Sequence, residues 1–105
     1  MFKRELPESG QKLVELMQSI QFGRIFCLGL SDGQIQFLPE TERVDDFKLG
    51  GNKQPKIKTP SSDFELKQEI SEFFHELREI GNGFIEVIEV KRGLPDIFRI
   101  RNKVA

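Results

Sequence analysis

The stretch LVELMQSIQFGRIFCLGLSDG, residues 13–33, decides the fold, because an altered copy of it returns as FFHELREIGNGFIEVIEVKRG, residues 73–93. Both copies run through an apolar helical pattern, a glycine, an apolar strand and a second glycine. At this offset of 60 residues, four positions are identical: Ile20/Ile80, Gly23/Gly83, Ile25/Ile85 and Gly33/Gly93. Since a repeated unit constrains the whole architecture, we predict an internal helix–hairpin repeat.

Each copy extends into a helix followed by a β-hairpin. In the first copy, apolar residues recur at helical spacing from Leu13 to Ile20, and Asp32-Gly33 favours a tight hairpin turn. In the second copy, the segment from Ser62 to Glu65 fits a capping box at the start of a helix. Residues 84–91 are rich in strand-forming side chains and predict the first strand of the second hairpin.

The predicted elements give an α+β fold with the order α-β-β-α-β-β in a single domain, residues 1–105. The first unit covers residues 9–38 and the second covers residues 63–103. Two helices on one face of a four-stranded antiparallel sheet make a stable two-layer arrangement, in which neither hairpin is an isolated ribbon. Residues 39–62 form a long connection that we expect to be flexible, because its second half, GGNKQPKIKTPSS, has little to bury.

Composition excludes several kinds of site. The 105 residues carry a formal net charge of −1, which gives no general attraction to nucleic acid or to a membrane surface. The single cysteine excludes an internal disulfide and a zinc site built from several cysteines. No apolar run approaches the ~20 residues of a transmembrane helix. We therefore expect a soluble, cytoplasmic chain without a cofactor and without a membrane partner.

The first predicted strand, RIFCLGL over residues 24–30, is apolar on both of its faces, and the copy at residues 84–90 repeats this pattern. Half-buried antiparallel strands normally alternate apolar and polar side chains, so a second layer is needed over the far face. If another subunit is that layer, the face that contacts it consists of Ile25, Cys27, Ile85 and Val87. The long connection is the other candidate, and the sequence leaves both open.

A basic hairpin near the C-terminus is a candidate nucleic-acid interface, because converging cations neutralise phosphates and make binding steeply salt-dependent. The candidate residues are Lys53, Lys56, Lys58, Lys91, Arg92, Arg99, Arg101 and Lys103. We favour the competing interpretation, a solvated strand face whose arginines meet the acids of the second helix. Single-strand binders also use exposed aromatic platforms, and no aromatic residue alternates with Arg99 and Arg101 on their side of the strand.

Cys27 and His75 are the conventional candidates for a nucleophile and a base. We expect Cys27 to be a small core residue in mid-strand, and His75 lies beside the apolar stripe of the second helix. Nothing in the pattern brings them together, so we predict no catalytic residues, no metal site and no enzyme activity. The leading hypothesis is a small interaction or regulatory module that forms a homo-oligomer, such as a homodimer, or binds a protein partner. The alternative is a small nucleic-acid-binding protein.

The segment LVELMQSIQFGRIFCLGLSDGQIQFLPETERV, residues 13–44, resembles the YezD-like family of short bacterial proteins. In that family a helix leads into an aromatic–glycine pair, a strand, an Asp-Gly turn and a return strand. The matching positions here are Phe22-Gly23, Ile25, Asp32-Gly33 and Ile35. The resemblance implies a small bacterial intracellular protein and supplies no catalytic or binding residues. Leu38-Pro39 interrupts the return strand, and residues 48–105 lie outside the resemblance.

Overall fold

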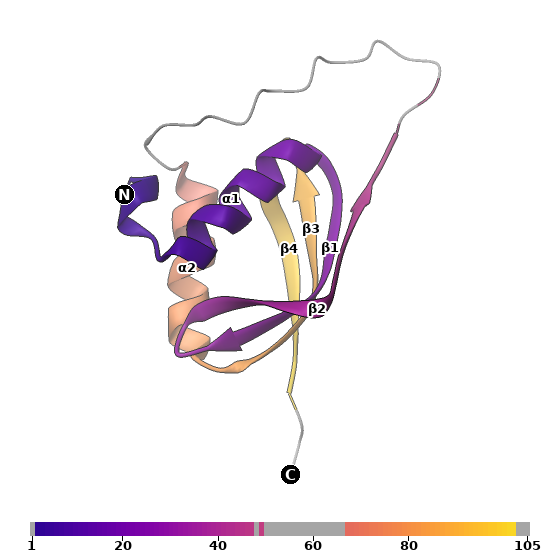
Figure 1. Ribbon diagram of the computed structural model, residues 1–105. Coiled ribbons are helices and arrows are strands. Elements are labelled where there is room, and N and C mark those ends of the chain that lie inside the picture. Colours follow the sequence, from indigo (N-terminus) through magenta and orange to yellow (C-terminus); the bar gives the residue numbers. More distant parts are fainter. Residues whose placement is uncertain (1, 48, 50–66, 103–105) are drawn as a thin grey trace.

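The computed structural model describes residues 2–47, 49 and 67–102. Its elements, labelled in Figure 1, are a 3-10 helix η1 (Lys3–Glu5), α1 (Glu8–Ile20), β1 (Phe22–Ser31), β2 (Gln34–Asp45), α2 (Gln68–Ile80), β3 (Gly83–Lys91) and β4 (Leu94–Arg101). The strands form one antiparallel sheet in the order β2-β1-β3-β4. The predicted α+β class, with a four-stranded antiparallel sheet and two helices, is therefore confirmed.

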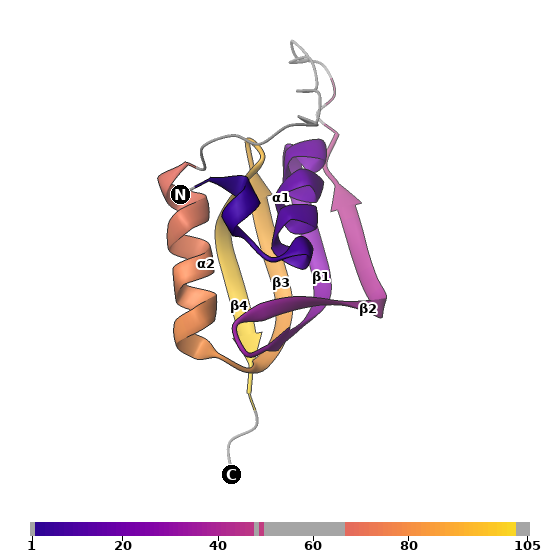
Figure 2. The same ribbon diagram turned by 60° about the vertical axis from the view of Figure 1, so that its left-hand side comes forward.

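Both α-helices lie against the same face of the sheet (Figures 1 and 2). Their apolar stripes are buried there together with the side chains that β1 and β3 direct toward them. Phe73 of α2 packs edge-to-face, with ring centroids 5.2 Å from Phe74 and 5.1 Å from Phe98 of β4. Burial of this apolar surface is the main favourable contribution to folding. In the described part of the chain, no helix or strand covers the opposite face of the sheet.

A β-bulge interrupts each central strand. The pairing of β1 with β2 shifts register between Phe26 and Leu28, and the pairing of β3 with β4 shifts between Ile85 and Val87. The extra residue of a bulge reverses the alternation of the side chains beyond it. Ile25 and Leu28 are three positions apart, and both therefore face the helices and are fully buried.

These bulges change which residues of β1 and β3 lie on each face of the sheet. Ile25 and Ile85, expected on a face that contacts another subunit, belong to the core between the sheet and the helices. Cys27, expected in the core, is the bulged residue of β1, with a φ of 65°, and it is only half-buried. Thr41 bridges the bulge, because its hydroxyl donates to the carbonyl oxygen of Cys27 and accepts from the backbone N–H of Leu38.

The two hairpin turns are each held at the end of the other unit's helix. The backbone N–H of Gly33 donates to the carbonyl oxygen of Gly81, after α2, at 2.7 Å. The backbone N–H of Gly93 donates to the carbonyl oxygen of Gln21, after α1, at 3.0 Å. Both turn glycines have a positive φ, 74° and 75°, which other residues adopt only with strain. The hydrogen bonds fasten each hairpin to the neighbouring unit.

β2 is longer than predicted. It runs to Asp45, so residues 39–45 belong to the sheet and not to a connection. β2 is an edge strand, where Pro39 is tolerated because the missing N–H can face away from the sheet. Figure 2 shows a sharp bend halfway along this strand. The bend accompanies the register shift opposite the bulge of β1.

α2 begins later than predicted. Lys67, in an extended N-cap conformation, precedes the first helical residue Gln68, whereas a capping box at Ser62 predicts an earlier start. Of the rest of the predicted flexible connection, residues 46, 47 and 49 are described, whereas residues 48 and 50–62 lie outside the described residues, as does the predicted capping box from Ser62 to Glu65.

Candidate interaction surface

The face of the sheet turned away from α1 and α2, here called the open face, carries three rows of side chains across all four strands. Paired residues of neighbouring strands share a face, so the register defines each row. From β2 to β4, the first row is Val44, Arg24, Glu89 and Ile97, the second is Glu42, Phe26, Val87 and Arg99, and the third is Gln36, Gly29, Phe84 and Arg101. Phe22 lies beyond the first row, opposite Lys91.

Apolar side chains are exposed on the open face. Phe22, Val44 and Ile97 are 42%, 38% and 49% exposed. Val87, in the middle of the second row, is only 6% exposed although no described helix covers it, because Phe26 and Arg99 flank it. It is the one residue of the four predicted for an oligomer contact that the register places in these rows. The register places Val44 and Ile97 at opposite edges of the first row, with Arg24 and Glu89 between them, so exposed apolar side chains flank a charged centre.

The charges of the open face and its rim are balanced. Arg101 binds one carboxylate oxygen of Glu86 through Nη2 at 2.9 Å and Nε at 3.0 Å. Its guanidinium also lies 5.6 Å from the ring centroid of Phe84, and Lys91 lies 3.3 Å from Asp96. The cations here are Arg24, Lys91, Arg99 and Arg101, and the anions are Glu42, Glu86, Glu89 and Asp96. The surface therefore presents matched charges and not a uniformly basic patch.

The structure describes half of the predicted nucleic-acid contacts, namely Lys91, Arg92, Arg99 and Arg101. The others, Lys53, Lys56, Lys58 and Lys103, lie outside the described residues. Arg99 and Arg101 share the open face, whereas Arg92 lies in the turn after β3 with a φ of 55°. The expected partners of the arginines, the acids of α2, lie on the other side of the sheet, and Arg101 binds Glu86 of β3 instead.

Sequence spacing misses the aromatic side chains that the register brings beside the arginines. Phe84 lies directly opposite Arg101, and Phe26 lies in the same row as Arg99. The only signal in the sequence is the alternation of Phe22, Arg24 and Phe26 along β1. Aromatic platforms beside arginines are also a feature of proteins that bind single-stranded nucleic acid.

Potential catalytic groups among the described residues do not converge. Cys27 lies in the bulge of β1, whereas His75 lies on the exposed side of α2, 3.8 Å from Glu79. The depression beside His75 is shallow and is lined by Glu72 and Glu76 of the same helix. In residues 2–47, 49 and 67–102, no three histidine, cysteine, aspartate or glutamate side chains are grouped to hold a metal ion.

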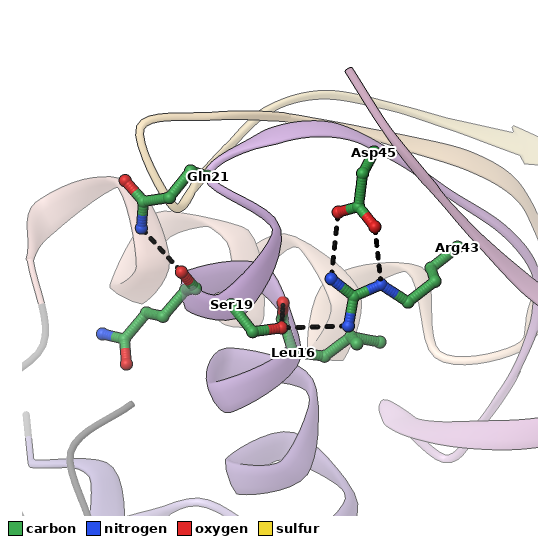
Figure 3. Close-up of polar contacts among 6 residues, drawn as sticks. Leu16, Ser19, Gln21, Arg43 and Asp45 are labelled. Carbon is green, nitrogen blue, oxygen red and sulfur yellow. Dashed lines mark hydrogen bonds and ion pairs between the residues drawn. The ribbon is translucent and has the colours of Figure 1, made fainter. Parts of the chain in front are cut away.

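Arg43 is the centre of a polar cluster on the helix side of the sheet (Figure 3). Its guanidinium donates to both carboxylate oxygens of Asp45, at 3.2 and 2.9 Å, and to the hydroxyl of Ser19 at 3.1 Å. The Ser19 hydroxyl donates in turn to the carbonyl oxygen of Leu16 in α1. Because these donors are engaged within the chain, the cluster fastens the end of β2 to α1 and is not an anion site.

Comparison with known proteins does not place the chain in a family. Of the helices in the described part of the chain, none has the length and apolar character needed to cross a bilayer. Comparison of the chain with protein-family models, with curated proteins and with solved structures finds no match.

Proposed function

We propose that this protein is a non-enzymatic interaction or regulatory module that binds a protein partner through the open face. The observation that carries the proposal is the exposure of Phe22, Val44 and Ile97 on a face that no described element covers. A partner that covers these side chains would gain about 25 cal/mol for each Å² of apolar surface removed from water. A sheet face is also a good docking surface, because two sheets pack closely when their strands are nearly aligned.

A nucleic-acid-binding function is the second candidate. It is supported by the position of Phe26 and Phe84 in the same rows as Arg99 and Arg101. The balance of charge argues against it, because affinity for nucleic acid depends on cations that are free to neutralise phosphates. Arg101 already binds Glu86, and Lys91 lies beside Asp96. We therefore rank a protein partner first.

The two helix–hairpin units are, in our proposal, copies of one ancestral unit of the YezD-like kind. Reciprocal contacts at the offset of 60 residues support this view. In the central pair of strands, Ile25 lies opposite Ile88 and Leu28 lies opposite Ile85, as a two-fold relation between the units requires. The two hydrogen bonds from turn to helix end follow the same relation. A bacterial origin and a cytoplasmic location belong to the same proposal.

Fluorescence anisotropy with labelled single-stranded oligonucleotides tests this ranking. We expect the wild-type protein to show no salt-sensitive binding at physiological ionic strength. If the open face does bind phosphates, the double variant Arg99→Gln/Arg101→Gln should weaken binding for all base sequences alike. The slope of log K against log salt should then fall by about two units, roughly one for each lost phosphate contact.

The matched control is Lys67→Gln/Arg78→Gln, which removes the same charge from exposed positions of α2 and its N-cap. Micromolar binding that is lost in the open-face variant and retained in this control would overturn the ranking in favour of nucleic acid.

A further inference from the structure

We propose that the partner of the open face is a second copy of this chain, related by a two-fold axis that runs parallel to the strands between β1 and β3. This inference rests on the proposed function. The rotation places β2 of one copy over β4 of the other and β1 over β3, at the same height along the strands. Each row therefore meets the same row of the partner in reverse order, which makes the contact isologous.

Charges on the rows are complementary under this rotation. In the first row, Arg24 lies over the partner's Glu89. In the second row, Glu42 lies over the partner's Arg99. Because the contact is isologous, each pair occurs twice. Complementary charges across an interface fix its register and exclude wrong arrangements.

Apolar positions match in the same way. Val44 lies over the partner's Ile97, so the two most exposed apolar residues of the rows cover each other. Gly29 lies over the partner's Phe84. A glycine inside a strand often marks close approach of another group, and a Cβ at Gly29 would already lie 3.2 Å from Cβ of Gln36.

A symmetric stacking about an axis across the strands and through the second row is disfavoured. A two-fold axis across the strands, through the second row, places each residue of that row over its own counterpart. Glu42 would face the partner's Glu42 and Arg99 the partner's Arg99, and such like-charge contacts cost several kcal/mol in an interface. The axis parallel to the strands avoids these like-charge contacts and pairs opposite charges instead.

The open face is also large enough for a stable dimer. Four strands at a spacing of about 4.8 Å make a face about 19 Å wide, and nine residues at about 3.3 Å extend about 30 Å along a strand. Because β2 bends sharply within this length, the projected area is an upper bound on the flat contact, and it is of the same order as the ~800 Å² per partner of a standard interface.

Charge reversal in two variants, alone and mixed, tests the arrangement. Arg24→Glu and Glu89→Arg each place like charges over one another twice in a homodimer, and each should raise the dimer dissociation constant roughly 100-fold. An equimolar mixture restores both opposite-charge pairs between the two variants, so heterodimers should form. Light scattering should give a mass near twice 12.2 kDa for the wild type and the mixture, and 12.2 kDa for each variant alone.

Two further variants serve as a control and as a second test of the interface. Lys12→Glu reverses an exposed charge on α1, outside the open face, and should remain dimeric. Val44→Lys places an ammonium group over the partner's Ile97 and should also yield monomers, so the test survives if a charge-reversal variant fails to fold.

Several results would overturn the inference. A wild-type chain that stays monomeric without binding oligonucleotides contradicts self-association but leaves a different protein partner for the open face. A monomer that binds oligonucleotides contradicts both proposals. A dimer that persists in Arg24→Glu, Glu89→Arg and Val44→Lys places the interface elsewhere on the molecule.

Discussion

Replacing Ile25 with alanine should lower the free energy of unfolding by about 2–5 kcal/mol, because it removes buried methyl groups and leaves a cavity. Ile25 is fully buried and lies between Ile88 of β3 and Arg43 of β2 in the sheet. A loss of this size is a large fraction of the ~5–15 kcal/mol that stabilises a typical domain. Urea denaturation followed by circular dichroism, at a concentration where the chain is monomeric, measures the change.

The matched control is Ile97→Ala, which removes the same atoms from a side chain that is 49% exposed on the open face. Its effect on the monomer should be below about 1 kcal/mol, as for most surface substitutions. Equal losses in the two variants would show that the bulge of β1 does not direct Ile25 into the core, and would contradict the assignment of the two faces.

Gly23→Ala should destabilise the protein by about 3 kcal/mol, at the upper end of the range for overpacked sites. A Cβ at this position would lie 2.0 Å from the carbonyl oxygen of Val44 and 2.8 Å from Cγ2 of Ile20. The carbonyl belongs to the backbone of β2, which cannot retreat without disturbing its pairing with β1. Thermal and urea unfolding should both show the loss.

Gly81→Ala provides the comparison, because it isolates backbone strain from a clash. Gly81 has a φ of 81° and a ψ of −63°, with nothing within 4 Å of an added Cβ, so only this backbone conformation is penalised. We expect a cost of about 1 kcal/mol. A Gly81 variant that is less stable than the Gly23 variant would mean that β1 and β2 are not as closely packed at Gly23 as the structure has them.

The two helices and the hairpin turns could be predicted from the sequence because their signals are local. Apolar residues at helical spacing mark the buried stripe of α1, and Asp32-Gly33 marks a turn whose residues indeed have positive φ. Each of these patterns depends on residues a few positions apart. The class of the fold follows from the order of such elements.

The faces of the central strands could not be predicted, because they depend on a bulge. Strict alternation separates Ile25 from Leu28, whereas the extra residue at Cys27 directs both into the core. The bulge is stabilised by Thr41, fourteen residues away, through a hydrogen bond to the carbonyl of Cys27. No pattern within β1 reveals such a contact, so strict alternation assigns Ile25 and Leu28 to opposite faces.

The aromatic and apolar side chains of the open face could not be predicted from the sequence for a related reason. Phe84 and Arg101 are neighbours only through the register of β3 with β4, and Val44 belongs to a strand that continues beyond Pro39. A sequence specifies the alternation within a strand but not which residues of the next strand share the row. Of the four residues predicted for an oligomer face, Ile25 and Ile85 therefore belong to the core, Cys27 is the bulge residue of β1, and Val87 lies on the open face.

The most direct test of the account is hydroxyl-radical footprinting of the wild-type protein at low and high concentration. Phe22 on the open face is 42% exposed, and Phe2 and Phe37, which lie outside that face, are 40% and 37% exposed. Phe37 is on the helix side, where Lys12 of α1 lies 5.6 Å from its ring centroid. The three side chains have the same chemical reactivity and nearly the same exposed fraction. A difference in their oxidation therefore reports a difference in how the surface around each one is covered. We predict that oxidation of Phe22 falls severalfold at high concentration while that of Phe2 and Phe37 is unchanged. Equal oxidation of all three at every concentration, or protection of Phe37 in place of Phe22, would contradict the claim that a second copy covers the open face.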